Sequence, residues 1–146
     1  MPGRWNLDLI EAGQAASFTK TIGEADLVLF AGVSGDTHPF YLDEEYARAT
    51  RFGGRIAPPA LVIGLMHAAF SAQLPNMDGV VTEASYRFFA PLRLGDTATA
   101  EATVEGVDRE AKRVVLILTC ANQNGGPIAD GRVVLLPAPE EIEVEA

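Results

Sequence analysis

The sequence predicts an α+β domain, with helices in the first half of the chain and strands in the second. A short alternating stretch at 17–22 is followed by three helix-like segments, and the longest of them is apolar on most of its circumference. Four stretches rich in β-branched residues follow between residues 80 and 136, separated by turns containing Gly, Asn or Asp. Because helices and strands are segregated, we expect an antiparallel β-sheet wrapped around one buried apolar helix.

The first strand is expected at Ser17–Ile22, and a helix follows it to about Val33. The acidic residues Glu24 and Asp26 would occupy its first turn, where negative charge suits the helix dipole. The apolar side chains expected in the core are Leu27, Phe30 and Ala31.

Two further helices are expected before residue 75. Asp43 is a good N-cap for a short helix over Glu44–Ala49, because its carboxylate can accept a free N–H of the first turn. Pro58-Pro59 then opens the third helix, Ala60 to about Leu74, since proline loses no hydrogen bond at the first helical position. This helix is apolar nearly all round, so we expect it inside the protein.

The second half of the chain is expected to form an antiparallel meander of four strands. Asn124-Gly125 lies between the last two stretches and is a strong hairpin signal. The four stretches are Val80–Pro91, Asp96–Val107, Arg113–Asn122 and Pro127–Leu136. Without a linker or an internal repeat, residues 1–146 are expected to form a single domain, with 137–146 as an acidic, frayed tail.

The composition is that of an ordinary soluble domain. Of the 146 residues 48% are hydrophobic, and the net charge of −9 comes without any cluster of Lys or Arg, which argues against nucleic acid or a membrane surface as a partner. The single Cys120 is expected to be a buried, reduced thiol. With no signal-peptide pattern and no apolar run of spanning length, we expect a cytoplasmic protein.

The run from Gly35 to Tyr41 carries the chemistry. Asp36 follows a glycine in a tight turn, His38 comes two residues later before a proline, and the apolar helix begins shortly afterwards. A helix N-terminus supplies free N–H groups and a partial positive charge. An acid held beside it therefore suits proton transfer next to a carbonyl group.

On these residues the chain resembles the MaoC-like hydratases and dehydratases, the (R)-specific enoyl-CoA hydratase group of the hot-dog fold. The residues that carry the resemblance are Ser34-Gly35-Asp36 with Pro39, Phe52-Gly53, Tyr86 to Leu92, and Leu94-Gly95-Asp96, in that order. The resemblance implies a hot-dog fold and a lyase activity. An acid and a His of the turn would hold one water, which adds to, or leaves from, the β position of an acyl-CoA or acyl-carrier thioester.

The chain departs from the family pattern at three places. Tyr41 stands at the position of the family's catalytic His, and His38 stands at the position of its Asn. Pro58-Pro59 replaces the His-Gly pair that opens the buried helix. Because Pro59 has no N–H, the thioester carbonyl would have to be polarised by the N–H of Ala60 or of Leu61.

Three interpretations of the altered site stay open. In the first, Asp36 is the base or water holder and pairs with His38 or with His67 on the buried helix. In the second, Tyr41 takes part directly, as a hydrogen-bond donor. In the third, the site is inactive and the chain is an acyl-binding or scaffolding subunit; a hot-dog thioesterase is a further alternative.

Other expectations concern ligands and partners. Arg51, Arg55 and Arg87 are candidates to meet the nucleotide phosphates of the substrate. Two His and scattered acids do not form a metal-binding pattern, and no Gly-rich phosphate loop follows a strand, so neither a metal nor a redox cofactor is expected. An open antiparallel sheet leaves an edge strand that an identical copy can pair, which predicts a homodimer or a larger homo-oligomer.

Overall fold

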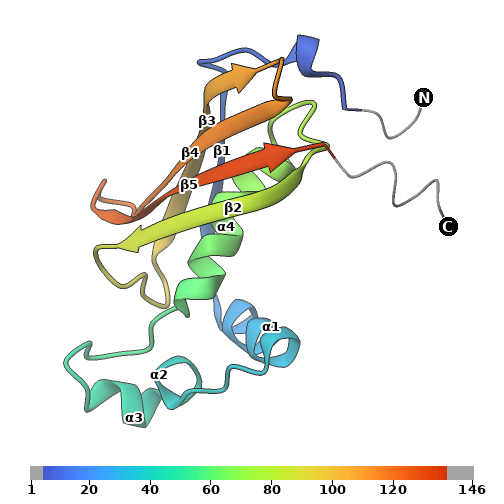
Figure 1. Cartoon of the computed structure of the whole chain (residues 1–146). Helices are drawn as coiled ribbons and strands as arrows, with labels where there is room; N and C mark the ends of the chain where they lie inside the picture. The colour runs from blue at the N-terminus through green and yellow to red at the C-terminus, as the bar shows by residue number, and fades with distance from the viewer. Residues whose placement is uncertain (1–4, 138–146) are drawn as a thin grey trace, which may run out of the picture.

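The computed structural model describes residues 5–137 and confirms the α+β architecture (Figure 1). A five-stranded antiparallel sheet in the order β1-β3-β4-β5-β2 packs against the helix α4. The strands are β1 (Ala15–Thr21), β2 (Val80–Phe88), β3 (Thr97–Asp108), β4 (Arg113–Ala121) and β5 (Pro127–Leu136). The helices are α1 (Glu24–Ser34), α2 (Pro39–Leu42), α3 (Glu44–Arg48) and α4 (Pro59–Ser71), with a 3-10 turn at Leu7–Leu9. The acidic tail predicted at 137–146 falls almost entirely outside the described residues.

Strand β2 lies at an edge of the sheet, so the four-strand meander predicted for residues 80–136 is wrong. It pairs with β5, with Val80 opposite Leu136 and Phe88 opposite Ala129. Only β3, β4 and β5 follow one another as neighbours, and β4 and β5 form the predicted Asn-Gly hairpin. The segment 89–96 contains Pro91 and passes the start of α4 instead of forming a tight hairpin. It carries the chain from β2 at one edge to β3, on the far side of β5 and β4.

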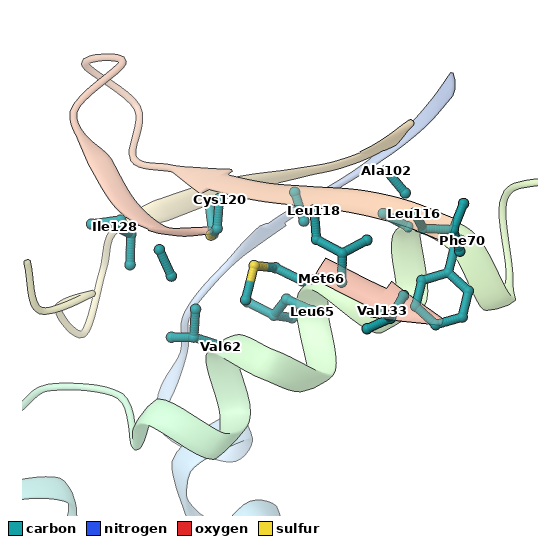
Figure 2. Close-up of a cluster of buried hydrophobic side chains, with 14 of the residues drawn as sticks. Val62, Leu65, Met66, Phe70, Ala102, Leu116, Leu118, Cys120, Ile128 and Val133 are labelled. Carbon is teal, nitrogen blue, oxygen red and sulfur yellow. The ribbon is translucent and has the colours of Figure 1, made fainter. Parts of the chain in front are cut away.

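Helix α4 supplies the helical half of the core. Its side chains Val62, Leu65, Met66 and Phe70 recur at helical spacing, are buried, and point toward the strands in Figure 2. The strand side chains labelled there are Ala102, Leu116, Leu118, Cys120, Ile128 and Val133. The buried thiol is thus confirmed, and α4 is buried on the face toward the sheet. Its opposite face is half-buried, with Ala60, Gly64 and Ser71 exposed, and the helix ends at Ser71 rather than Leu74.

Helices α1, α2 and α3 lie beyond one end of the sheet, and α1 is the one nearest to the start of α4 (Figure 1). In α1 the carboxylate of Asp26 accepts the N–H of Gly23 at 2.8 Å, which closes the helix start. Leu27 and Ala31 are buried as predicted. Phe30 is only half-buried, which corrects that prediction, because few elements pack on α1.

Polar contacts hold this helical layer together. The Asp43 carboxylate accepts the N–H of Tyr46 at 3.1 Å, which confirms Asp43 as the N-cap of α3. The guanidinium of Arg55 donates to Glu44 at 3.0 Å and to Glu24, so the segment before α4 is tied to both α3 and α1. Within residues 5–137 no helix is long and apolar enough to cross a membrane.

Candidate active site

The turn after α1 presents Asp36 to solvent. Gly35 ends α1 with φ of 79°, a left-handed conformation that glycine adopts without strain. The N–H of Asp36 donates to the Ser34 hydroxyl at 3.1 Å, and the Asp36 carboxylate accepts the N–H of His38 at 3.4 Å. The carboxylate is thus oriented by its own turn and keeps lone pairs free for a water or a substrate.

His38 is the N-cap of α2, a short helix that sequence reasoning missed. Its Nδ1 accepts the N–H of Phe40 at 3.1 Å, and its ring stacks on Phe40 with 4.3 Å between centroids. In a neutral imidazole whose Nδ1 is an acceptor, the proton is on Nε2. His38 in this arrangement therefore offers an N–H donor, while a base at Nδ1 would require loss of the cap.

Tyr41 lies one helical position beyond Phe40 and is half-buried. Burial and the negative charge of Asp36 both raise the pKa of its phenol. The burial of the phenol is the larger of the two causes. With its pKa raised, Tyr41 stays protonated at neutral pH and serves as a donor, not as a base.

His67 points from α4 to the sheet instead of toward the Asp36 turn. Its Nε2 is hydrogen-bonded to the hydroxyl of Tyr86 on β2, and its ring lies 5.0 Å from that of Phe70. Burial lowers the pKa of this imidazole, which favours its neutral form. Among residues 5–137 neither imidazole is hydrogen-bonded to the Asp36 carboxylate; the contact there is with the backbone N–H of His38.

A glycine in β5 makes room for the contact between His67 and Tyr86. Gly131 lies opposite Tyr86, and a Cβ built on it would come within 2.6 Å of the Tyr86 ring and 3.1 Å of the Ser85 carbonyl oxygen. The absence of a side chain lets the phenol cross β5 and reach α4. The available sequence signal was a lone glycine inside a strand pattern, which often marks close approach of another group.

The start of α4 retains one free backbone donor. The N–H of Leu61 donates to the carbonyl oxygen of Pro58 at 2.9 Å, and the N–H of Val62 reaches the same oxygen at 3.3 Å. Pro59 has no N–H, and the N–H of Ala60 has no acceptor among the described residues. Of the two donors expected from the sequence, Ala60 is therefore the one left unengaged.

The three candidate arginines differ in what they contact. Arg55 is only 11% exposed, and its guanidinium is held by Glu24 and Glu44. Arg51 is exposed over the Phe52 ring, with 4.9 Å between its Cζ and the ring centroid. Arg87 is paired with Asp130 at 2.7 Å, on the rim of a hollow of about 290 Å³ between β2, β4 and β5. The guanidinium of Arg51 is thus accessible to an anion. That of Arg87 is exposed but engaged by Asp130, and that of Arg55 holds the helical layer.

An antiparallel sheet packed on one helix, with a helical layer that carries the Asp36 turn beyond one end of the sheet, defines a hot-dog fold of the hydratase class. Residues 8–123 match the MaoC like domain, and the chain belongs to this family.

Similar proteins lie in the same group. The chain is 41% identical to an (R)-specific enoyl-CoA hydratase of Rhodospirillum rubrum, over 88% of this chain and 90% of the relative. It is 31% identical to a 3-hydroxybutyryl-CoA dehydratase of Methylorubrum extorquens, over 92% of this chain and 85% of the relative. Among solved structures, the unliganded R-hydratase PhaJ1 of Pseudomonas aeruginosa superposes with a TM-score of 0.84 at 35% identity, covering 92% of this chain and 86% of that one.

Proposed function

We propose that this chain is a lyase that reversibly adds water to the β position of a trans-2-enoyl thioester of coenzyme A. Membership of the MaoC-like family and the similarity to named hydratases and dehydratases support this activity. The observation that carries the proposal is the turn at Asp36, whose exposed carboxylate accepts the N–H of His38 at 3.4 Å and is followed five residues later by Tyr41.

The proposed chemistry uses one base and two kinds of donor. Asp36 takes a proton from a water molecule as the water oxygen forms a bond to the β carbon of the enoyl thioester. The electron pair of the double bond moves toward the thioester carbonyl, whose oxygen accepts the N–H of Ala60. Asp36 then returns the proton that it took from the water to the α carbon, which completes the addition and restores the carboxylate; the reverse sequence expels water.

The water would be oriented by the Tyr41 hydroxyl and by the Nε2–H of His38. We prefer His38 to His67 as the imidazole partner of Asp36, because His38 lies in the same turn while His67 is engaged by Tyr86. Pro59 would line the carbonyl site without donating to it. Arg51 and Arg87 stay candidates to bind the phosphates of the substrate. Arg55 would not touch the substrate; its ion pairs with Glu24 and Glu44 would hold α1 and α3 in position.

We also propose that the working unit is a homodimer or a larger homo-oligomer. Asp36 is exposed in the single subunit, and three apolar side chains of the adjacent helix α1, those of Val28, Leu29 and Val33, are also exposed. A hydratase needs its base out of bulk water, because electrostatic stabilisation is stronger in a site that excludes solvent. Coverage by a second subunit would supply that environment; a cytoplasmic location fits this function and stays a prediction.

The activity is tested by following the absorbance of the enoyl-thioester bond with trans-2-enoyl-CoA substrates of increasing chain length, and with the matching acyl-carrier thioesters. We expect the wild-type protein to hydrate at least one substrate. Tyr41→Phe should lower the rate, because it removes a water-orienting hydroxyl. Tyr46→Phe is the matched control, since Tyr46 packs near the same His38 ring but lies on α3. Absence of hydration with every substrate would refute the proposal.

A second candidate is a non-catalytic acyl-binding subunit, favoured by the lack of a hydrogen bond between Asp36 and an imidazole ring. It predicts that a saturated acyl-CoA raises the melting temperature of the protein while no enoyl-CoA is hydrated. Release of free CoA thiol from the same substrates would instead identify a thioesterase. Hydration, thermal stabilisation and release of CoA thiol thus distinguish a hydratase, an acyl-binding subunit and a thioesterase on one protein preparation.

A further inference from the structure

Two arginines of this acidic chain form no ion pair with a described residue. The net charge is −9, and among residues 5–137 every other arginine lies against a carboxylate. Arg51 and Arg93 do not, and both side chains are exposed. A guanidinium without a carboxylate partner, in a chain with a surplus of carboxylates, is available to an external anion.

Both guanidinium groups lie against the same residue, Phe52. The Cζ of Arg51 lies 4.9 Å from the centroid of the Phe52 ring, and Nη1 of Arg93 donates to the Phe52 carbonyl oxygen. Nε and Nη2 of Arg93 have no acceptor among the described residues. Two like charges held side by side repel each other, and an anion between them offsets this repulsion. The two arginines are therefore suited to a phosphate group, which a guanidinium binds through parallel N–H groups.

Two acidic side chains close to these arginines in the sequence are engaged by other groups. The Asp96 carboxylate accepts the backbone N–H of Arg93 at 2.8 Å and the side-chain amide of Gln123 at 2.9 Å. The Glu44 carboxylate on α3 accepts Nε of Arg55 at 3.0 Å. Because both carboxylates would have to give up these contacts to reach a further guanidinium, they leave the charge of the two arginines uncompensated.

The turn after Phe52 leaves room and a backbone donor for such a group. Gly53 has φ of 68°, a left-handed conformation that glycine adopts without strain. The N–H of Gly54 has no acceptor among the described residues, and a Cβ built on either glycine meets nothing within 4 Å. Backbone N–H groups in turns of this kind form concave sites that bind anions. The Gly53-Gly54 turn thus adds a neutral donor to the two guanidinium groups.

Arg93 is held beside the segment that leads into α4. It forms an isolated bridge with Ile56, and the N–H of Ala57 donates to the Leu92 carbonyl oxygen at 2.7 Å. Ala57 lies three residues before Ala60, whose N–H is the proposed donor to the thioester carbonyl. In an acyl-CoA the pantetheine arm separates the diphosphate from the thioester. A phosphate site must therefore lie beside the carbonyl site and not within it, which is the position of Arg93.

We propose that Arg51 and Arg93 bind the diphosphate of coenzyme A, and that the chain therefore acts on CoA thioesters in preference to thioesters of a carrier protein. The inference rests on the proposed hydratase activity and adds the kind of thioester, which the sequence left open. A carrier-bound thioester has a single phosphodiester in place of the diphosphate, so it offers less negative charge to the two guanidinium groups. Arg87 is the weaker candidate, because Asp130 accepts two of its N–H groups.

Kinetics with a full and a truncated substrate test the site. Arg51→Gln and Arg93→Gln should each raise KM for an enoyl-CoA by about three- to tenfold, with kcat within about twofold of wild type. The matching enoyl-pantetheine has no phosphate, so its KM should be the same for wild type and both variants. A loss of packing in the helical layer would instead impair both substrates equally. Arg132→Gln, which removes an exposed charge on β5, is the matched control and should change neither KM.

A binding measurement separates this inference from the activity. In calorimetric titrations, coenzyme A should bind the wild-type chain more tightly than pantetheine does, and Arg51→Gln/Arg93→Gln should weaken coenzyme A by about tenfold or more without changing pantetheine. This result supports the site even if no enoyl thioester is hydrated.

Three results would overturn the inference: equal affinities of the wild-type chain for coenzyme A and pantetheine, equal effects of the variants on both substrates, or a lower KM for an enoyl-carrier thioester than for the enoyl-CoA. Each of them leaves the hydratase activity standing wherever hydration itself is observed.

Discussion

The two histidines of this chain lie in environments of opposite kinds. His38 is exposed in the turn beyond α1, and each of its hydrogen bonds is to a group within three residues in sequence. His67 is half-buried in the middle of α4, and its partner Tyr86 comes from an edge strand. The first environment depends on local sequence, while the second depends on the sheet register and on Gly131.

This difference separates the chemistry from the packing. A turn held by its own backbone can present an acid and an imidazole without support from the core, so substitutions there should change activity with little effect on stability. The pair of His67 and Tyr86 joins α4 to β2, so substitutions there should lower stability with little direct effect on activity. Substitutions in the turn and in the pair of His67 and Tyr86 test this contrast.

The largest effect is expected for Asp36→Asn. Asparagine still accepts the His38 N–H, so the turn should persist and the melting temperature should stay within about 2 °C of wild type. The loss of a base should lower kcat by about a thousandfold. Steady-state kinetics and thermal unfolding measure the two quantities. An active Asp36→Asn variant would remove Asp36 from the mechanism.

His38→Asn separates the cap from the imidazole. Asn is a good N-cap, so α2 should keep its start and the free energy of unfolding should change by less than about 0.5 kcal/mol. If His38 holds the water, kcat should fall by about a hundredfold. Measuring kcat for His67→Gln alongside supplies the comparison: a loss confined to the His67 variant would move the imidazole partner onto α4.

Gly131→Ala is expected to destabilise the fold, because the new Cβ would meet the Tyr86 ring at 2.6 Å and force it away from His67. The cost should be about 1–3 kcal/mol in the free energy of unfolding, measured by urea denaturation. Gly64→Ala is the matched control. A Cβ there meets nothing within 4 Å, and Ala in a helix should stabilise by about 0.5–1 kcal/mol.

The smallest effect is an acid sensitivity that depends on His67. Burial holds the pKa of His67 below its ordinary value of 6.5 in the folded state, so the unfolded chain binds this proton more readily. The titration of His67 therefore has no effect on stability well above pH 6.5, and protonation of its imidazole destabilises the fold as the pH falls below that value. His67→Gln should lose less stability than wild type between pH 7 and pH 5 in urea titrations. Equal losses would mean that His67 is as well solvated when folded as when unfolded.

Much of the fold could be predicted because its signals are local. The acidic first turn of α1, the Asp43 cap, the Pro58-Pro59 start of α4 and the Asn-Gly hairpin each depend on a few neighbouring residues. The position of β2 could not be predicted in this way. Whether β2 pairs with β3 or with β5 depends on the path of the connection at 89–96 across the sheet. No local sequence pattern predicts that path.

The candidate site likewise has a part that depends on local sequence and a part that depends on the sheet register. The turn residues Asp36, His38 and Tyr41 are close in sequence, and their grouping in space followed from the turn itself. Helix α2 was missed because four residues carry too little periodicity to predict a helix. The partner of His67 was missed because a contact between α4 and β2 depends on the strand register and on the gap left by Gly131.

The proline pair at the start of α4 has a consequence for affinity. Each pyrrolidine ring locks one backbone torsion, and Pro58 has φ of −57°. The amide of Ala60 therefore keeps a fixed direction before any ligand arrives, and little conformational entropy is lost when a carbonyl oxygen binds to it. Pro58 and Pro59 thus fix a hydrogen-bond donor in advance, at the cost of two backbone N–H groups.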